Sequence, residues 1–568
     1  MKKAAFLILL ISGLRLVAQT QGYLDINNVK AIIMNRNDMF WNLQTSNAEY
    51  EVPKFSGKNC AFASSVWVGG LDGGGQLHMA GMTYRQNGVD FWPGPLDTLT
   101  GGIDSTISSQ YNRIWKLNAN DINSFLQAYA SGSVTANTFT PAADILSWPA
   151  NGNTNSGYSK HLAPFVDVNL DGYYNPMHGD YPKIKGDQMI FYVCNDAYGL
   201  HTETKGMPLG IEMQVSAYAY GCPSVLASNP ALNNATFYHF KIINRSPIQY
   251  NNAMMGIWID PDIGNYLDDY VGCDTLKNIG YVYNADNFDE NANGYGNFPP
   301  LLSYLVLKGP AAPTNDNIDN NHNGIIDEAG EDFRFNRFMH YTNNIGAHPY
   351  ATTNPDSTSE YYGYMNAIWK DNKALRADSS GYLKGVSAPV TRYAFPGNPQ
   401  NNLGWTEFTK NNLKGDRKIV IGNGPFTMLP GSSHELEYSI LTTFDSTANG
   451  HKNVTKMFAQ NAVLKSFYDL VNKPLCSTPI PVSLTELSQQ AVPIQLWPNP
   501  ANDYVYLSSA TPLIGKLVVI RNSMGQIVNE DKLRTERTKI DISSLAPGLY
   551  FVEISGSGIQ GRTKLIKQ

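Results

Sequence analysis

The sequence predicts a mainly β protein, with a large antiparallel β-sandwich that has few helices and a small C-terminal immunoglobulin-like β-sandwich. Three observations favour this fold class. Charged residues make up only 16% of the 568 residues, while glycine, tyrosine and proline are abundant, as in loop-rich, strand-rich domains. Apolar and polar residues alternate over many short segments between residues 188 and 445, which is the period of a half-buried strand. Clusters of glycine, proline and asparagine separate these segments, as turns do in antiparallel sandwiches.

Residues 1–18 have the pattern of a secretory signal peptide. Lys2 and Lys3 precede an apolar run over residues 4–11, and the sequence around Ala18 fits a cleavage site,. The run is far shorter than the roughly 20 apolar residues that a membrane-spanning helix needs. We therefore expect cleavage after Ala18, export to the periplasm and no transmembrane segment.

The β-rich passenger is expected over residues 19–473, as one or two sandwich domains. Its clearest strand covers residues 211–219, where Ile211, Met213 and Val215 alternate with Glu212 and Gln214. This alternation predicts one face in the core and one polar or aromatic face. Residues 238–242 and 436–440 repeat the pattern.

Two helices are expected in the passenger. A short one covers residues 121–129, which carry apolar residues on one helical face,. The other begins after an Asn453 cap and ends before Lys473 and Pro474,. We expect the second helix to pack across the end of the main domain.

Residues 474–492 are rich in proline, serine and threonine and have weak periodicity, so they are interpreted as a linker. Residues 493–568 contain short alternating segments that suggest about seven strands. Turns are expected at residues 523–526 and 546–548,.

This terminal segment resembles the type A sorting domain of the type IX secretion system of Bacteroidetes. Four ordered blocks carry the resemblance: Trp497-Pro498-Asn499-Pro500-Ala501 with Asp503, Asn522-Ser523-Met524-Gly525-Gln526, Ile542-Ser543-Ser544-Leu545-Ala546-Pro547-Gly548-Leu549-Tyr550, and Lys564-Leu565-Ile566-Lys567. The resemblance implies recognition by the outer-membrane translocon. It also implies a passenger that is secreted or attached to the outer cell surface, with surface polysaccharide or another glycan as a further expected partner. Several passenger segments are similar to large Bacteroidetes surface proteins of unknown role, which implies no activity.

The charge and the cysteines restrict the function further. The net charge of −6 comes without a stretch dense in lysine and arginine, so a nucleic-acid partner is not expected. The five cysteines form no CxxC pair, which argues against a zinc ribbon. A disulfide between Cys222 and Cys273 and buried free thiols are both compatible with the spacing.

Two segments have the D-x-[DN]-x-[DN]-G pattern of a calcium loop, in which alternate side chains converge on the ion. The first starts at Asp167 and the second at Asp319, and a weaker third copy starts at Asp289 with Asn291 and Asn293. Neither of the first two has glutamate at the twelfth position, so they are not complete EF-hands. The predicted ligands are Asp167, Asn169, Asp171, the Tyr173 carbonyl, Asn175 and Asp180, and then Asp319, Asn321, Asn323, the Ile325 carbonyl, Asp327 and Glu331. Turns without an ion are the alternative, since Asn, Asp and Gly favour turns anyway.

An acidic cluster follows the expected strand over residues 254–259. Five carboxylates this close in sequence repel one another unless they are solvated, protonated or bridged by a cation. A further metal site and a solvated acidic loop are both compatible with the pattern. The cluster comprises Asp260, Asp262, Asp268, Asp269 and Asp274.

Enzyme signatures are absent from the sequence: no H-E-x-x-H, G-x-S-x-G or G-x-x-x-x-G-K motif occurs,. We therefore expect a non-enzymatic, calcium-stabilised adhesion or binding protein. A secreted glycan-active hydrolase is one alternative, because a pair of catalytic carboxylates leaves no spacing signature. A carbohydrate-binding module is another, and it predicts a row of exposed aromatic side chains.

Overall fold

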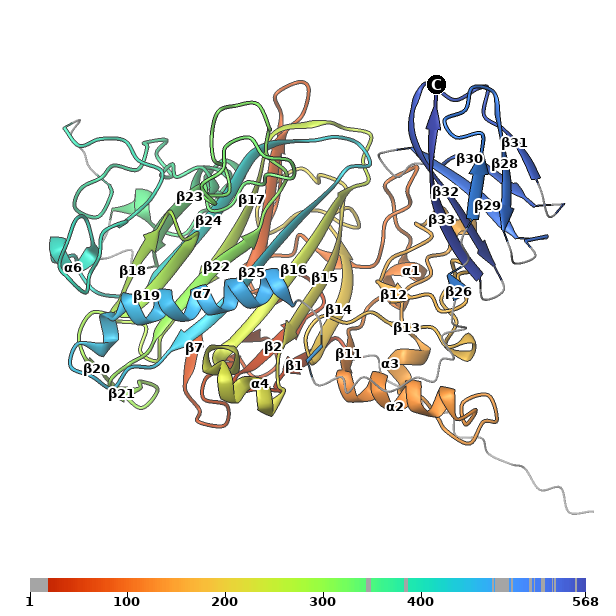
Figure 1. The fold of residues 1–568 in the computed structure, drawn as a ribbon. Helices are drawn as coiled ribbons and strands as arrows, with labels where there is room; N and C mark the ends of the chain where they lie inside the picture. The colour runs from red at the N-terminus through yellow and green to blue at the C-terminus, as the bar shows by residue number, and fades with distance from the viewer. Residues whose placement is uncertain are drawn as a thin grey trace, which may run out of the picture. The chain divides into compact units, whose positions relative to one another are not determined.

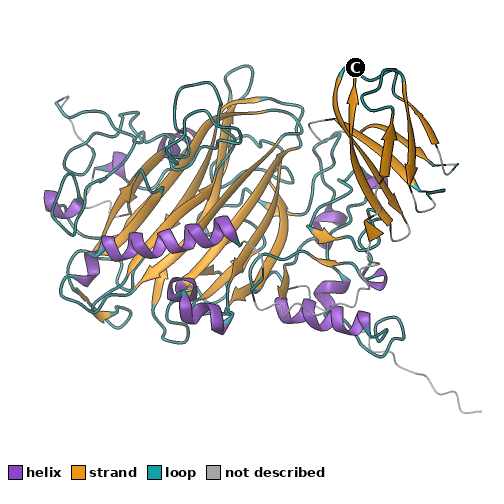
Figure 2. Ribbon diagram, in the orientation of Figure 1, coloured by secondary structure: helices purple, strands orange, loops and turns teal. Residues whose placement is uncertain are grey.

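The computed structural model describes residues 19–343, 349–382, 387–471, 474–475, 490–491, 494–509, 513–514, 516–522, 527–533, 535, 538–556 and 559–568. The expected signal peptide, most of the expected linker and the turn at residues 523–526 lie outside the described residues. The chain forms two compact units, Met1–Phe125 with Thr140–Thr478, and Leu126–Phe139 with Pro479–Gln568. Strands dominate both (Figure 2).

The larger unit contains two large antiparallel sheets (Figure 1). The first sheet has the order β23-β24-β17-β8-β3-β2-β6-β7, with β1 beside β2 and β9 beside β8. Its strands are β1 (Gln21–Leu24), β2 (Lys30–Met34), β3 (Asp38–Met39), β6 (Tyr50–Glu51), β7 (Asn59–Ala61), β8 (Ala63–Leu71), β9 (Leu77–Ala80), β17 (Tyr250–Asp260), β23 (Arg337–Thr342) and β24 (Arg417–Met428).

The second sheet has the order β10-β14-β15-β16-β25-β22-β19-β18, with β11 beside β14. Its strands are β10 (Trp92–Pro93), β11 (Trp115–Asn118), β14 (Gln188–Asn195), β15 (Ile211–Ala219), β16 (Ala235–Asn244), β18 (Asp269–Asp274), β19 (Ile279–Asn284), β22 (Leu301–Lys308) and β25 (Ser433–Thr443). Three small hairpins pair β4 (Trp41–Asn42) with β5 (Asn47–Ala48), β12 (Phe165–Val166) with β13 (Tyr181–Pro182), and β20 (Phe288–Asp289) with β21 (Gly296–Asn297).

The two sheets share one apolar core. Side chains from both, such as Trp67 of the first sheet and Phe240 of the second, belong to the same buried cluster. Hydrogen bonds also join the sheets, since the Tyr50 hydroxyl lies 2.9 Å from the Thr236 hydroxyl. Burying so many aromatic rings provides much of the driving force for folding. The predicted antiparallel β-sandwich is confirmed.

Strand β15 differs from the prediction, because all nine of its residues are buried. The face expected to be polar or aromatic lies against other side chains: Tyr218 stacks on Phe237 with ring centroids 5.1 Å apart and donates to Glu437. Tyr220, just beyond the strand, packs against Phe467 with centroids 4.8 Å apart. A helix later in the chain packs on this face. The alternation of residues within a strand does not predict such packing.

The helices are short except for two. They are α1 (Ser105–Gln110), α2 (Ala119–Ala130), α3 (Ala143–Leu146), α4 (Pro223–Ser228), α5 (Thr358–Met365), α6 (Glu407–Lys410) and α7 (Val454–Leu470), and the 3-10 turns are η1 (Thr154–Ser156), η2 (Pro176–His178), η3 (Pro230–Asn234), η4 (Tyr350–Thr352) and η5 (Gly450–Lys452). Helices α2 and α7 confirm the two predicted helices. Within the described residues, no helix has both the length and the hydropathy needed to cross a membrane.

Helix α7 begins as predicted, with the Asn453 side chain accepting a hydrogen bond from the Lys456 amide,. Its expected position at the end of the domain is wrong, because α7 lies across the face of the second sheet over β22 and β25 (Figure 1). The helix buries Asn461, whose amide donates to the Ser303 hydroxyl on β22 at 2.9 Å. Helix α7 thus forms a third, partial layer over this face of the second sheet.

The turn before α7 contains a buried histidine that is expected to make the fold sensitive to acid. His451 is 3% exposed, and burial, followed by the nearby Lys452 charge, lowers the pKa of its imidazole to about 4. Unfolded histidine titrates near 6.5, so the contribution of neutral His451 to stability is complete above that pH and is lost as the pH falls toward 4. The loss amounts to at most about 3 kcal/mol. We expect urea denaturation to show a smaller loss of stability between pH 7 and pH 4.5 for His451→Gln than for the wild type. Equal losses would contradict this assignment.

The smaller unit contains a two-sheet β structure. One sheet has the order β26-β33-β32-β29-β30 and the other the order β27-β28-β31. The strands are β26 (Gln490–Ala491), β27 (Ile494–Trp497), β28 (Tyr504–Ser509), β29 (Leu517–Asn522), β30 (Ile527–Lys532), β31 (Thr538–Asp541), β32 (Gly548–Gly556) and β33 (Ile559–Lys567). Val505 and Leu507 of one sheet and Val552 and Leu565 of the other share a core.

The cysteines do not form the bridge that was considered between Cys222 and Cys273. Cys222 is disulfide-bonded, but Cys273 is a buried free thiol, as are Cys60 and Cys194. The Cys273 sulfur lies 3.2 Å from the Ala394 carbonyl oxygen, inside the core. These three residues therefore pack as small apolar side chains.

Candidate metal centre

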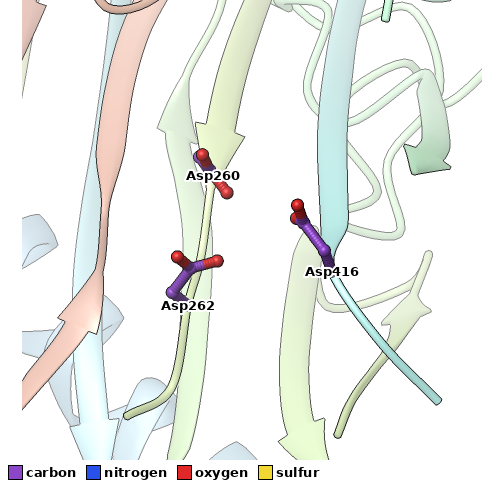
Figure 3. A group of neighbouring side chains, drawn as sticks. All are labelled: Asp260, Asp262 and Asp416. Carbon is purple, nitrogen blue, oxygen red and sulfur yellow. The ribbon is translucent and has the colours of Figure 1, made fainter. Parts of the chain in front are cut away.

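Three aspartates and one lysine meet at the ends of two neighbouring strands. β17 pairs with β24 with Ile259 opposite Ile419, so Asp260 and Lys418 stand opposite each other one residue further along. Asp262 lies on the loop after β17 and Asp416 on the segment that leads into β24 (Figure 3). Single carboxylate oxygens of Asp260, Asp262 and Asp416 all lie within 4.8 Å of one another. We call these three residues the aspartate triad.

Lys418 already provides a positive charge for this triad. Its Nζ lies 2.6 Å from Asp260 Oδ1 and forms a second ion pair with Asp416. Both Lys418 and Asp260 have almost no exposed side-chain surface. The Tyr84 hydroxyl donates to Asp260 Oδ2 at 2.5 Å. The Lys418 ammonium group thus lies where the three carboxylates would also stabilise a metal ion.

The electrostatics of the triad follow from its burial. Burial, and then the Asp260 charge, raises the pKa of Asp262 well above its usual range. Burial also raises the pKa of Asp260, although Lys418 opposes this change. For Lys418, burial disfavours the ammonium form, but the attraction of Asp260 and Asp416 prevails and raises its pKa. The lysine is therefore charged, and it forms ion pairs with two of the three aspartates, Asp260 and Asp416,.

A second group of carboxylates lies nearby, and we call it the second acidic cluster: Asp268, Asp269, Asp289 and Glu290. The first two stand at the start of β18 and the last two at the end of β20. Asp268, Asp269 and Asp289 are each 1% exposed. Asp289 is fixed by the backbone, because its carboxylate accepts hydrogen bonds from the Asn265 and Tyr295 amides at 3.1 and 2.6 Å.

Burial, and then the interaction with Glu290, raises the pKa of Asp268 to about 8. Burial also raises the pKa of Asp269 well above its usual range, and repulsion from Asp268, Asp262 and Asp289 adds to this change. The nearest ion-pairing lysine is Lys414, with its Nζ 3.6 Å from Glu290 Oε1. With a pKa of about 8 the Asp268 carboxyl keeps its proton at neutral pH, so the cluster is less negative than four ionised carboxylates would be.

Asp274 does not belong to either group, which corrects the prediction. It ends the six-residue strand β18 that Asp269 begins, and a strand rises about 3.3 Å per residue. Asp274 instead pairs with Lys277, with Nζ 2.7 Å from Oδ2. Closeness in sequence therefore overestimated the size of the cluster.

The first predicted calcium loop closes the β12–β13 hairpin. Asp167 Oδ2 accepts a hydrogen bond from the Gly172 amide at 2.7 Å, while Oδ1 is buried and has no hydrogen-bond partner in the described structure. Asn169 and Asp171 are exposed, and Asp171 accepts from the Tyr173 amide. Among the described residues, Asp167 is thus the predicted ligand of this loop that has a buried oxygen without a hydrogen-bond partner.

Asp180 has a different role from the predicted one. It is fully buried, and its two oxygens accept hydrogen bonds from the Val168 and Asn175 amides, both at 2.8 Å. The Asn175 side chain accepts from the Met177 amide, at the start of η2. Asp180 therefore stabilises the conformation of the loop, because its carboxylate accepts hydrogen bonds from two backbone amides of the loop.

The second loop lies between β22 and β23. Asp319 accepts from the Asn323 and Gly324 amides. Glu331 is 1% exposed and its Oε1 accepts from the Asn320 amide, but its buried Oε2 has no partner among the described residues. Asp327 differs from the prediction, because its carboxylate accepts from the Asp316 and Asn317 amides and holds the preceding turn.

Glu328 was not predicted as a ligand, yet it lies at the centre of the second loop. Its Oε1 accepts from the side-chain amides of Asn321 and Asn323, both at 2.6 Å, and these contacts lower its pKa. Its Oε2 is buried without a partner in the part of the chain that is described. The Ile325 amide donates to Asn323 Oδ1 at 2.8 Å, and the role of the Ile325 carbonyl as a ligand stays a prediction. The signal for Glu328 was its position directly after Asp327.

Other residues were missed because they are distant in sequence. Asp416 and Lys418 lie more than 150 residues after Asp260, and only strand pairing brings them together. Glu290 directly follows Asp289, the start of the weak third loop, and the structure places that loop at the second acidic cluster. The weak third calcium loop and the acidic stretch after β17, which are separate in sequence, thus meet in the second acidic cluster.

The comparisons with known proteins concern mainly the C-terminal segment. The family model of the secretion system C-terminal sorting domain matches residues 495–568. Residues 495–568 are a secretion sorting domain. The chain therefore carries a type IX secretion sorting domain, which indicates export to the outer cell surface or secretion. The sorting domain comprises β27 to β33 and ends the smaller unit.

The similarity to a curated protein is also narrow. β-Agarase A of Zobellia galactanivorans is 36% identical over 73 residues, which are 13% of this chain and 13% of that protein. The chain thus spans about an eighth of that relative's length.

Three solved structures align with low scores. A polysaccharide lyase has a TM-score of 0.18 at 8% identity, covering 63% of this chain and 34% of the other. The adhesin domain of Epf from Streptococcus pyogenes has a TM-score of 0.12 at 8% identity, covering 63% and 92%. PorZ of the type IX secretion system of Porphyromonas gingivalis has 0.12 at 10% identity, covering 96% and 75%. Scores this low support no structural inference.

Proposed function

We propose that the passenger is a calcium-stabilised, non-enzymatic binding protein of the cell surface, which the sorting domain delivers for adhesion or for contact with a glycan. The observation that carries this proposal is a set of buried carboxylate oxygens that lack hydrogen-bond partners in the described structure. They belong to the loops in which the sequence pattern predicted calcium ligands: Asp167 Oδ1, Glu328 Oε2 and Glu331 Oε2.

A buried carboxylate oxygen without a partner is costly, and a divalent cation removes that cost. Oxygen-only ligands suit a hard cation such as calcium, which is plentiful outside cells and binds extracellular modules with millimolar dissociation constants. In this interpretation the ion stabilises two long connections, the β12–β13 hairpin loop and the segment between β22 and β23. Long loops held in this way are suited to binding rather than to core packing.

The aromatic side chains that could have formed a row on a glycan-binding surface are buried. We therefore propose a binding surface that is not built from such a row. Trp41, Trp67 and Trp115 lie in the core with 9% exposure or less, and Tyr218 and Tyr220 lie under α7. His201, which is buried, has both ring nitrogens beside backbone carbonyl oxygens, at 2.7 and 2.8 Å. These contacts give it a structural role.

Removing calcium is expected to destabilise the mature chain. Because the ion binds the folded state, calcium at 100 times its dissociation constant adds about 2.7 kcal/mol of stability. Calorimetric melting of the mature chain should therefore show a lower melting temperature in excess chelator than in calcium. An unchanged melting temperature would refute the structural role of calcium.

Loop variants locate this effect. Asp167→Asn combined with Glu328→Gln is expected to reduce the melting difference between calcium and chelator. Asp97→Asn is the matched control, since Asp97 also caps a turn, accepting from the Leu99 and Thr100 amides at 2.8 and 2.7 Å, but has no calcium-loop pattern around it. Its calcium-dependent difference should equal that of the wild type.

The binding role needs a separate assay. The mature chain should bind selected polysaccharides or cell surfaces on an array without releasing new reducing ends or unsaturated products. Product release would instead favour a glycan-active enzyme, and retention confined to one sugar class would favour a carbohydrate-binding module.

A further inference from the structure

The aspartate triad brings an amine and a carboxyl group into direct contact away from solvent. Lys418 Nζ lies 2.6 Å from Asp260 Oδ1, and the two side chains are only 3% and 2% exposed. Asp260 ends β17, and Lys418 stands near the start of the neighbouring strand β24. An amine and a carboxyl group are the two reactants that condense to an amide with loss of water. The pair thus holds both reactants on two neighbouring strands.

Aromatic side chains enclose this pair. Trp258 lies on the same face of β17 as Asp260 and stacks on Trp67, with ring centroids 5.9 Å apart,. Its indole nitrogen donates to the Tyr341 hydroxyl at 2.7 Å, and Tyr341 stands opposite Lys418 on β23. Little water reaches a pair that is buried in this way, so an amide formed there is protected from hydrolysis.

Three further groups are placed to orient the carboxyl group and to move protons. The Tyr84 hydroxyl donates to Asp260 Oδ2. Asp262 lies beside Asp260 (Figure 3), with carboxylate oxygens within 4.8 Å, and burial raises its pKa, so it keeps a proton that it can donate. Asp416 forms an ion pair with Lys418 and can accept a proton from it. An acid and a base thus flank the reactants, as general acid–base catalysis requires.

We propose that Lys418 and Asp260 condense to an intramolecular amide, an isopeptide bond, that links β24 to β17. The ion pair described above is the starting state. Lys418 gives one ammonium proton to the Asp260 carboxylate, and the neutral amine nitrogen then attacks the Asp260 carboxyl carbon and forms the C–N bond. Asp416 takes a second proton from the nitrogen. Asp262 gives its proton to the Asp260 hydroxyl, which leaves as water when the C–O bond breaks. The proton on Asp416 then returns to Asp262, so water is the only by-product.

Two properties of the site favour this reaction. Contact between the amine and the carboxyl group makes the step intramolecular, which is equivalent to a very high concentration of either reactant. The amide is uncharged, so its formation also removes the cost of burying two charges. Asp262 and Asp416 are half-buried, whereas Asp260 and Lys418 are buried, which leaves the released water a short path to solvent.

The bond cross-links the first sheet between two of its neighbouring strands, β17 and β24. Asp260 and Lys418 are more than 150 residues apart in sequence, and a cross-link over so long a segment restricts the unfolded chain, as a disulfide does. Such a bond suits a surface protein that is pulled while it holds a partner. It is also independent of the proposed function, because the predicted calcium loops take no part in it. A negative result with calcium therefore leaves the bond unaffected.

The first test is a mass measurement that needs no variant. The mature chain is purified in the folded state, then unfolded and reduced, and its intact mass is measured. We expect a mass lower than that of the sequence by one water molecule. Proteolytic digestion should also give one branched peptide that joins the segment containing Asp260 to the segment containing Lys418. Two separate, unmodified peptides in place of the branched one would overturn the proposal.

Variants assign the chemistry. Lys418→Met removes the amine and should restore the full mass. Lys370→Met is the matched control, because Lys370 Nζ also lies 2.6 Å from an aspartate and its side chain is 2% exposed, but that aspartate, Asp356, is 57% exposed. The control should keep the mass deficit, and its loss there would place the bond elsewhere and overturn the proposal.

Asp262→Asn tests the proton donor and serves if Lys418→Met does not fold. General acid–base groups contribute about 10²–10⁴-fold to a rate, so we expect cross-linked chain to accumulate at least about 100-fold more slowly after synthesis. The fraction of branched peptide at successive times measures this rate. Accumulation at the wild-type rate would overturn the role of Asp262 as the proton donor.

Discussion

Replacing Lys418 with methionine is expected to lower the free energy of unfolding by about 3–5 kcal/mol, because it leaves buried carboxylates without a counter-charge. Lys418 holds Asp260 at 2.6 Å and also pairs with Asp416, and both ends of the Asp260 pair are nearly inaccessible. Methionine keeps most of the side-chain length and the apolar contacts of the lysine stem. The loss therefore measures the charge. Urea denaturation at neutral pH measures the change.

An exposed lysine gives the matched control for this substitution. Lys465 on α7 pairs with Asp469 at 2.8 Å, with nearly half of each side chain exposed, and such pairs contribute about 0.3–0.5 kcal/mol. Lys465→Met should thus change stability little. The double variant Asp260→Asn/Lys418→Met should recover part of the loss, because it removes one uncompensated charge. Additive losses from the two single substitutions would contradict a direct pair.

Local sequence predicts the elements of this fold well. Helix α7 follows from its apolar spacing and its Asn453 cap, because both act within a few turns of chain. The position of α7 does not follow, since its cover over β22 and β25 depends on contacts between distant segments. The complete burial of β15 was missed for the same reason.

The candidate sites show the same difference between features set by local sequence and features set by contacts between distant segments. The predicted loop at Asp167 forms a turn in which Asp167 accepts a hydrogen bond from the Gly172 amide, and its calcium ion stays a prediction. The acidic stretch after β17 was seen, yet its partition into two groups was not. Strand pairing recruits Lys418 to one group and a hairpin brings Glu290 to the other. Asp274 was wrongly included because strand β18 carries it away from Asp269.

Arg417 and Lys418 are neighbours in sequence and serve opposite faces of β24, as alternation along a strand requires. Lys418 faces the triad, whereas Arg417 forms a buried pair with Glu407 at the start of α6, with Arg417 Nη2 2.9 Å from Glu407 Oε2. Arg417 Nε also donates to this carboxylate, and Glu407 Oε1 accepts from the Val271 amide on β18 at 2.9 Å. One ion pair therefore connects β24, α6 and β18.

Arg417→Met is expected to cost about 3–5 kcal/mol of unfolding free energy, since Glu407 keeps a buried charge. Its remaining donors among the described residues are the Val271 amide and, at 3.4 Å, the Asn412 side chain. Loss of the ion pair should also destabilise α6, because a helix of only four residues is too short to be stable by itself. We expect hydrogen exchange to accelerate in residues 404–415 in this variant. Lys410→Met, which removes an exposed pair with Asp378 from the same helix, should leave exchange in that segment nearly unchanged. Equal acceleration in both variants would mean that the segment is held by the helix surface and not by the buried pair. Slow exchange in both would mean that packing alone holds α6 and that the ion pair contributes to stability without fixing the segment.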